Sequence, residues 1–184
     1  MCAGPGGKAA LLSNIAREKK IVFTANEVSA VRADLVRQVV NGDRVLVGDG
    51  REIGDLGEKF DAILIDAPCT GLGALRRRPE VRWRRNLQDL RELTQLQREL
   101  IDSGIKALTV GGILGYATCS PHLAETTIQV SDLKRKHANM EQIDVSPYLP
   151  DNLENSVREH AMALWTHRTG TDAMFLALFK KVSE

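Results

Sequence analysis

Apolar residues recur along the chain in two patterns, short continuous runs and longer segments with helical spacing. The short runs, bounded by polar or turn-forming residues, predict strands at residues 21–25, 45–48, 62–66, 113–117 and 174–179. The helical spacing predicts helices at residues 9–17, 31–40 and 87–110, with Ser29 as the N-cap of the second. Strands that alternate with helices indicate an α/β fold whose sheet is mostly parallel and carries helices on both faces.

The longest predicted helix carries one apolar stripe. Its members recur at steps of three and four residues: Leu87, Leu90, Leu93, Leu96, Leu100, Ile101, Ile105 and Leu108. A stripe of this kind packs against the core of a domain and has no functional implication. Residues 146–172 contain two prolines and few adjacent apolar residues, which indicates a loop-rich excursion before the last strand.

Length and composition indicate a single domain. The chain has 184 residues, of which 43% are hydrophobic, enough for one core. Lysine and arginine total 25 against 24 aspartate and glutamate, so the net charge of +1 requires any basic surface to be local. The sequence shows neither a membrane-spanning apolar stretch nor the order of a signal peptide, which favours a cytoplasmic protein. Three cysteines, an odd number, favour free thiols in a reducing compartment.

Two cysteine tripeptides are the strongest chemical signal. Pro68-Cys69-Thr70 and Thr118-Cys119-Ser120 each follow an apolar run that predicts a buried parallel strand, so both thiols should emerge at the same edge of one sheet. Ligands bind at that edge in open α/β folds. A single cysteine is commonly a small buried hydrophobe, but two at one ligand-binding edge favour addition of a thiol to a pyrimidine ring. The pattern predicts methylation of carbon 5 of cytosine in RNA.

A glycine-rich motif opens the chain. Cys2-Ala3-Gly4-Pro5-Gly6-Gly7-Lys8 runs directly into the first predicted helix, where glycines let backbone amides approach a carboxylate or phosphate. The motif lacks the spacing and the ending of a nucleoside-triphosphate loop. Glu27 follows the first predicted strand and could accept hydrogen bonds from ribose hydroxyls. Asp49 follows the second predicted strand and could contact the edge of an adenine base. Either acid alone is better explained as a helix cap or a solvated loop residue, but the three features together favour a cofactor site.

These motifs resemble those of the RNA (cytosine-5) methyltransferases of the Sun/Fmu and Nop2 family. Cys2 to Lys8 is similar to the first motif of that family, Ile65 to Gly71 to the fourth, and Tyr116 to Pro121 to the sixth. The stretch Arg76 to Trp83 and the closing Gly170 to Phe175 also match. Among bacterial members, the chain most resembles enzymes that modify small-subunit ribosomal RNA. The resemblance implies a Rossmann-like fold, S-adenosylmethionine as cofactor, and residues 1–184 as one catalytic domain acting on RNA, most specifically 16S ribosomal RNA.

The resemblance also implies a role for each cysteine. Carbon 5 of cytosine is a poor nucleophile until a thiolate adds at carbon 6. Cys119 would be that nucleophile, and Cys69 would help to release the methylated product. Lys8, nearby arginines or backbone amides could lower the pKa of the attacking thiol. Asp66 would bind either the N3 and N4 edge of cytosine or the amino group of the cofactor, and the sequence leaves both roles open.

A local cluster of positive charge follows the first cysteine motif, where six arginines and one glutamate lie between residues 76 and 85. The predicted RNA contacts are Arg76, Arg77, Arg78, Arg82, Trp83, Arg84 and Arg85. Arginine pairs with phosphate, and both residue types stack on bases, although a solvated charge run is the plain alternative. No metal site is expected, because the four histidines, His122, His137, His160 and His167, show no metal-ligand spacing. His122 is close enough to Cys119 in sequence to affect its ionisation.

One departure from the family and two alternatives are also apparent. In the family an apolar strand precedes the glycine-rich motif and lies in the middle of a sheet ordered 3-2-1-4-5-7-6, whereas only Met1 precedes Cys2 here. We therefore expect a catalytic domain that is incomplete at its N-terminus, with unpaired backbone beside the missing first strand and a weakened cofactor site. The first alternative is a non-catalytic RNA-binding or assembly module of the same fold. The second is a thiol protein in which Cys2, Cys69 and Cys119 converge on a metal or a disulfide.

Overall fold

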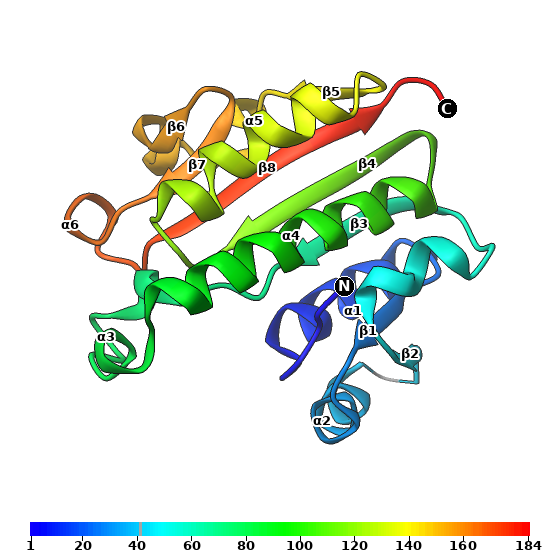
Figure 1. Ribbon diagram of the computed structural model, residues 1–184. Coiled ribbons are helices and arrows are strands. Elements are labelled where there is room, and N and C mark those ends of the chain that lie inside the picture. Colours follow the sequence, from blue (N-terminus) through cyan, green and yellow to red (C-terminus); the bar gives the residue numbers. More distant parts are fainter. Residues whose placement is uncertain (41) are drawn as a thin grey trace.

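The structure is a computed structural model that describes residues 1–40 and 42–184 (Figure 1). Its helices are α1 (Gly7–Glu18), α2 (Ala30–Val39), α3 (Val81–Arg84), α4 (Leu87–Ala107), α5 (Thr127–Lys136) and α6 (Thr166–Thr169). Its strands are β1 (Thr24–Glu27), β2 (Arg44–Val47), β3 (Phe60–Asp66), β4 (Leu108–Thr118), β5 (Met140–Ile143), β6 (Val157–Arg158), β7 (Ala161–Leu164) and β8 (Met174–Lys181). Short 3-10 turns are η1 (Gly50–Asp55), η2 (Leu72–Ala74), η3 (Leu123–Glu125), η4 (Ser146–Tyr148) and η5 (Asp151–Ser156). Within the two described ranges, none of the helices is long and apolar enough to cross a membrane.

The larger sheet is built around β4, which lies between β3 and β8. Ile63 on β3 pairs with Leu114 in a parallel register, whereas Gly115 on β4 pairs with Leu178 in an antiparallel register. β5 and β7 both pair with the other edge of β8, and β6 pairs with β7. The sheet is therefore mixed, and the prediction of a mostly parallel sheet is wrong. The chain turns back between β7 and β8 at one end of the sheet, so β8 runs against β4, and an apolar run does not encode that direction.

β1 and β2 form a separate parallel pair, and the first three residues lie between this pair and β3. On one side, the Met1 amino group donates to the Leu64 carbonyl at 2.6 Å, and the Asp66 amide donates to the Met1 carbonyl at 3.2 Å. On the other side, the Ala3 amide donates to the Asn26 carbonyl at 2.9 Å. The strands thus form two sheets, and residues 1–3 bridge them by backbone hydrogen bonds at the position where the family resemblance implies a first strand. The expectation of unpaired backbone is therefore wrong for Leu64, Asp66 and Asn26.

The main core lies on the face of the larger sheet that α4 and α5 cover (Figure 1). The inward side chains of the sheet are almost completely buried: Ile63, Ile65, Leu114, Tyr116, Phe175, Ala177 and Phe179. Leu100, Ile101 and Ile105 of α4 belong to the same cluster. Burial of each such aliphatic side chain contributes about 1.5–3 kcal/mol. The predicted apolar stripe is confirmed over these turns, while Leu87 at its start is 75% exposed.

The opposite face of the larger sheet is only partly covered. Leu64, Leu176 and Leu178 are half-buried there. Together with side chains of α1 they line an apolar cavity of about 470 Å³. The expectation that helices cover both faces is therefore confirmed for the face under α4 and α5. It is wrong for the opposite face, which helices cover only in part.

The predicted elements occur, with shifts at their ends. α4 ends at Ala107 instead of residue 110, because β4 begins directly at Leu108. β1 begins at Thr24, and Ile21 and Val22 of the predicted strand are exposed after α1. The region 146–172 contains the β6–β7 hairpin and α6, which were not predicted, because elements of two to four residues are too short to show periodicity. The sequence analysis also missed α5 and β5.

Candidate active site

The two cysteine motifs meet beyond the carboxyl ends of β3 and β4. These strands are parallel neighbours, so the residues that follow them leave the sheet at the same edge. The pairing continues one step further, where the Ala67 amide donates to the Ala117 carbonyl at 2.8 Å. The Sγ atoms of Cys69 and Cys119 are 3.4 Å apart, within hydrogen-bond distance. The juxtaposition predicted from the sequence is therefore present.

This contact makes the two thiols electrostatically different. A hydrogen bond from Cys69 lowers the pKa of Cys119 to about 7, although burial and the charge of Asp66 act to raise it. Lys8 also lowers the pKa of Cys119, as the sequence suggests, but less than Cys69 does. The same hydrogen bond, followed by burial and the charges of Cys119 and Glu125, raises the pKa of Cys69. The arrangement favours a Cys119 thiolate that accepts a hydrogen bond from a protonated Cys69.

Both thiols open into a cavity of about 840 Å³, which is within the size range of small-molecule sites. The predicted residues at its wall are Cys2, Gly4, Lys8, Glu27, Asp49, Asp66, Cys69, Cys119, Arg78, Arg84 and Arg85. The other predicted site residues do not line this cavity: Ala3, Pro5, Gly6, Gly7, Arg76, Arg77, Arg82 and Trp83. The cavity thus joins the thiols to part of each predicted binding region.

The glycine-rich loop packs closely against β1 and α2. The Gly4 amide donates to Glu27 Oε2 at 2.9 Å, and a Cβ atom at Gly4 would lie 2.8 Å from that oxygen. Gly6 is the N-cap of α1 with a φ of +121°, a conformation that favours glycine. Because the amides of Ala3 and Gly4 are bonded within the protein, the prediction of ligand-facing amides is wrong for these two residues.

The acids at the ends of β1 and β2 both have an arginine partner. Glu27, with a side chain 2% exposed, lies 2.6 Å from Arg32 Nη2. Asp49 lies 2.6 Å from Arg51 Nη2, and this partner lowers the pKa of Asp49. A ligand that reaches either carboxylate must therefore compete with a guanidinium group for its lone pairs.

The donor set of the wall nevertheless fits S-adenosylmethionine. Carboxylates at the ends of successive strands accept hydrogen bonds from ribose hydroxyls and amino groups in this type of fold. Asp66 adds a third carboxylate, whose Oδ2 accepts from Lys8 Nζ at 2.9 Å. Asn26 also lines the cavity, and its buried Oδ1 has no hydrogen-bond partner among the described residues. Such an orphaned acceptor is what a ligand donor group would satisfy.

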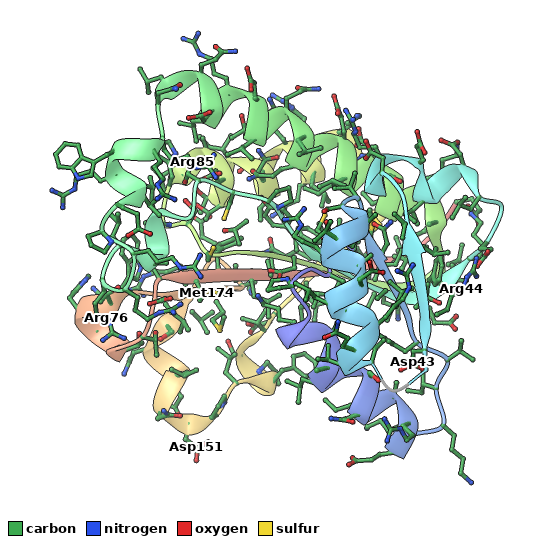
Figure 2. All side chains as sticks on the ribbon, turned by 90° about the horizontal axis from the view of Figure 1, so that it is seen from below. Asp43, Arg44, Arg76, Arg85, Asp151 and Met174 are labelled. Atoms are coloured by element: carbon green, nitrogen blue, oxygen red, sulfur yellow. The ribbon has the colours of Figure 1, made fainter. Side chains whose placement is uncertain are left out.

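The arginine-rich stretch runs through α3 at one end of the molecule. Figure 2 shows Arg76 and Arg85 at this end and Arg44 at the other. Trp83 on α3 is 81% exposed, and the Arg82 guanidinium carbon lies 5.8 Å from its ring centroid. An exposed tryptophan beside exposed guanidinium groups resembles a stacking surface more than a packed core.

Arg77 differs from its neighbours because it has a structural partner. Its Nε donates to the two carboxylate oxygens of Asp172 at 2.9 and 3.0 Å. Gly73 fixes the same region, since its amide donates to the Cys119 carbonyl at 2.9 Å and its carbonyl accepts from the Ala173 amide at 3.0 Å. The sequence analysis missed the roles of Gly73 and Asp172, and the only available signal was the family match of residues 170–175.

Three buried polar side chains behind the cysteines were also missed. Gln97, Tyr116 and Glu125 are each at most 1% exposed. Gln97 follows Leu96 on the apolar stripe of α4, and a polar residue at a core position is the signal that could have identified it. Gln97 and Glu125 contact the Cys69 loop, and Tyr116 contacts both of them.

Cys2 and His122 stand apart from the thiol pair. Burial raises the pKa of Cys2 to about 11, so this thiol stays protonated at neutral pH. His122 caps η3, with its Nδ1 accepting from the Ala124 amide at 3.1 Å. The side chains with the largest effects on the pKa of Cys119 are Cys69, Asp66 and Lys8. The cysteines are free, and the described residues hold no group of three or more acidic, histidine or cysteine side chains suited to a metal ion.

Comparisons with known proteins agree with this geometry. The chain matches the family model described as "16S rRNA methyltransferase RsmB/F" over residues 1–180. It is 48% identical over 185 residues to the "Putative methyltransferase Rv1407" of Mycobacterium tuberculosis, covering 100% of this chain and 40% of that protein. It is 36% identical over 149 residues to the ribosomal RNA small subunit methyltransferase B of Pectobacterium carotovorum, covering 78% of this chain and 34% of that protein. The chain therefore spans well under half the length of these relatives.

A solved structure gives the same result for the fold. NSun6 from Pyrococcus horikoshii, determined with SFG, superposes with a TM-score of 0.85 at 30% identity. The match covers 100% of this chain and 47% of that one. The mixed sheet and the edge that carries the two thiols thus belong to a fold seen among solved structures.

Proposed function

The chain belongs to the 16S rRNA methyltransferase RsmB/F family, whose methyl donor is S-adenosylmethionine, and we propose that it methylates carbon 5 of cytosine in RNA through Cys119. The thiol pair is the observation that carries this proposal. Cys119, with its pKa lowered to about 7, receives a hydrogen bond from Cys69 across 3.4 Å at the wall of a cavity. A cysteine that only packed would stay protonated and would need no second thiol beside it.

The first chemical step is addition of the thiolate. Cys119 Sγ forms a bond to carbon 6 of cytosine, and the ring electrons move so that carbon 5 becomes nucleophilic. Carbon 5 then takes the methyl group that S-adenosylmethionine supplies when bound. In the closing step a base removes the proton from carbon 5, the carbon 6–sulfur bond breaks, and Cys119 leaves as a thiolate.

Cys69 and Asp66 would assist at opposite ends of this cycle. Cys69 retains the proton of the pair, so its thiol can donate to Cys119 as the carbon–sulfur bond breaks and thereby stabilise the leaving thiolate. Asp66 lies at the end of β3 beside Lys8. It can bind the N3 and N4 edge of cytosine, where a hydrogen bond stabilises charge that develops on addition, or it can bind the amino group of the cofactor.

The cofactor would be held by the glycine-rich side of the cavity. The residues assigned to it are Cys2, Ala3, Gly4, Pro5, Gly6, Gly7, Lys8, Glu27, Asp49 and Asp66. Asn26 joins them as an unpaired acceptor at the wall. The arginine partners of Glu27 and Asp49 would have to yield some of their contacts to the ligand.

RNA would approach the cavity across the arginine-rich stretch, in the cytoplasm. Arg78, Arg84 and Arg85 line the cavity and can pair with phosphate, while Trp83 and Arg82 offer stacking faces. The target cytosine must be single-stranded or flipped out of a helix to reach Cys119. The family name favours 16S ribosomal RNA as the substrate. Residues 1–184 would form one catalytic domain.

The proposal is tested by trapping with RNA that carries 5-fluorocytidine, in the presence of S-adenosylmethionine. Fluorine at carbon 5 cannot leave as a proton does, so a working nucleophile stays bound to the base in an adduct that survives denaturing electrophoresis. We expect the adduct with the native chain and none with Cys119→Ala. RNA binding without an adduct would contradict the catalytic proposal and favour the alternative of a non-catalytic RNA-binding module, for which the divided sheet is the supporting observation.

A further inference from the structure

Glu125 lies behind the Cys69 loop and has no part in the chemistry proposed above. It is the last residue of η3 and is 0% exposed. Its Oε1 accepts hydrogen bonds from the Thr70 amide at 2.8 Å and from Gln97 Nε2 at 3.1 Å, and its Oε2 accepts from the Thr70 hydroxyl at 2.5 Å. Each of these bonds is donated to Glu125 by a neutral group, as suits an ionised carboxylate, which can only accept.

The same contacts hold the backbone on both sides of Cys69. After the cysteine, the Thr70 amide is bonded to Glu125. Before it, the Pro68 carbonyl accepts from Gln97 Nε2 at 2.8 Å. Since Gln97 also donates to Glu125, the peptide groups that flank the thiol are tied to one buried pair of side chains. Cys69 therefore has little freedom to move relative to this pair.

The Cys119 loop is attached to the same network. The Thr70 and Ser120 hydroxyl oxygens are 3.3 Å apart, so the residues that follow the two cysteines contact each other. Because the Thr70 hydroxyl donates to Glu125, Ser120 is the donor in this second contact. The carboxylate thus orders a chain of contacts that runs from one cysteine loop to the other.

Tyr116 fixes the orientation of the network from β4. Its hydroxyl lies 3.1 Å from Gln97 Oε1 and 2.8 Å from the Glu125 carbonyl oxygen, so its one hydrogen is shared between these two acceptors. Because Gln97 Oε1 faces the Tyr116 hydroxyl, Gln97 Nε2 faces the Pro68 carbonyl and Glu125, to which it donates. A fully satisfied buried network of this kind is rigid.

Glu125 also acts on the ionisation of the thiols through its charge. Its negative charge is one of the causes that raise the pKa of Cys69, and it is not among the causes that shift the pKa of Cys119. The effect is unequal because Glu125 contacts the Cys69 side of the pair, through Thr70. A buried carboxylate placed in this way penalises a thiolate on Cys69. It acts in the same direction as the hydrogen bond between the thiols and against the charge of Asp66, which raises the pKa of Cys119.

We propose that Glu125 is a positioning residue that holds the Cys69 loop against the Cys119 loop and confines the negative charge of the thiol pair to Cys119. The proposal deepens the function above and rests on it, since it explains which cysteine attacks. It makes Cys69 the proton donor by placement and not by any difference in its own chemistry.

The test is alkylation of the two thiols with iodoacetamide at pH 7.5, located by peptide mass spectrometry, without RNA or cofactor. In the native chain most of the label should be on Cys119. Glu125→Gln keeps the shape and removes the charge, and we expect the ratio of label on Cys69 to label on Cys119 to rise severalfold, because the charge of Glu125 is one of the smaller causes that raise the pKa of Cys69. Glu125→Asp, which keeps a carboxylate, should restore most of the native ratio.

Two further variants separate the charge from the packing. Gln129→Leu removes another buried polar side chain of the same region, one that contacts the Thr94 and Ala124 carbonyls, and should leave the ratio unchanged. Thr70→Val removes the hydroxyl and keeps the carboxylate, so it should raise the labelling rate of both thiols without moving label to Cys69. An unchanged ratio in folded Glu125→Gln would overturn the proposal. If Glu125→Gln does not fold, a transfer of label to Cys69 in Thr70→Val would overturn it instead.

Failure of this inference and failure of the proposed function give different results. If the ratio shifts as expected but the native chain forms no adduct with 5-fluorocytidine RNA, the charge assignment stands and the catalytic proposal fails. If the native chain forms the adduct while Glu125→Gln keeps the native ratio, catalysis stands and Glu125 has only a packing role.

Discussion

The Sγ atoms of Cys69 and Cys119 lie 3.4 Å apart although the two residues are 50 positions apart in the sequence. One proton between two sulfur atoms makes one cysteine a donor and the other an acceptor. The largest cause of the pKa difference is the hydrogen bond between the two thiols, while Glu125 near Cys69 and Lys8 near Cys119 favour a thiolate on Cys119 and Asp66 opposes it. The chemistry of the pair is therefore a property of the fold and not of either tripeptide.

Alkylation of Cys119 should follow a pH profile with a midpoint of about 7, because its pKa is lowered to about 7 and only the thiolate reacts. The rate should fall as the pH drops below that value. Cys69→Ala removes the hydrogen bond that lowers the pKa, so the midpoint should move up by more than one pH unit, toward the ordinary thiol value of about 8.5. Cys69→Ser is the matched control, since its hydroxyl still donates and should keep the midpoint low. Equal midpoints in the native and Cys69→Ala proteins would contradict the assigned hydrogen bond.

Replacement of each cysteine should have a distinct effect on methyl transfer to RNA. Cys119→Ala should abolish the transfer, because no nucleophile can add to carbon 6. Cys69→Ala should instead accumulate a covalent protein–RNA adduct with ordinary cytidine, because the leaving thiolate loses its donor. Denaturing electrophoresis of reactions with labelled RNA distinguishes the two outcomes. An adduct formed by Cys119→Ala would mean that the roles are reversed.

Gly73→Ala should destabilise the protein strongly. A Cβ atom there would lie 2.1 Å from the Ala173 carbonyl oxygen and 2.6 Å from the Cys119 carbonyl oxygen, both in the backbone. We expect a loss of at least about 3 kcal/mol in the free energy of unfolding, measured with urea. Gly48→Ala places its Cβ in open space and should change that free energy by no more than about 1 kcal/mol. Similar losses in the two variants would disprove the close contact at Gly73.

Salt should weaken RNA binding through the arginine-rich stretch. The double variant Arg84→Gln/Arg85→Gln removes two cations at the cavity wall, so the slope of log K against log salt should become shallower by about 1.4 if each contacts a phosphate of single-stranded RNA. The control Lys19→Gln/Lys20→Gln removes the same charge after α1, outside the described wall, and should keep the native slope. Fluorescence anisotropy at several salt concentrations measures both slopes. Identical slopes in the two double variants would refute the assigned interface.

An apolar strand added upstream of Met1 should tighten binding of S-adenosylmethionine. Met1 already pairs with β3 and Ala3 with β1, so about five added strand residues would continue between the two sheets. We expect calorimetric titration to give a Kd at least tenfold lower than that of the 184-residue chain. A glycine–serine extension of the same length is the control and should have no effect. Equal affinity in all three proteins would show that the division of the sheet does not weaken the site.

The sequence predicted those parts of the fold that depend on local pattern. The stripe of α4 and the edge shared by Cys69 and Cys119 follow from periodicity and from the parallel pairing of β3 with β4. The direction of β8 did not follow, because it depends on how the chain returns to the sheet. The contacts of Glu125 did not follow for a similar reason, since its partners Thr70 and Gln97 are remote in sequence.

The division of the sheet has a consequence for any molecule bound in the cavity. Glu27 and Asp49 lie at the carboxyl ends of the strands of one sheet, while Asp66 and the two thiols lie at the carboxyl ends of strands of the other. A ligand that touches both groups spans a seam between the two sheets, which the backbone hydrogen bonds of Met1 and Ala3 bridge. Binding of such a ligand must fix the two sheets relative to each other. The measured affinity therefore depends on how freely the sheets move against each other, as well as on the contacts with the ligand.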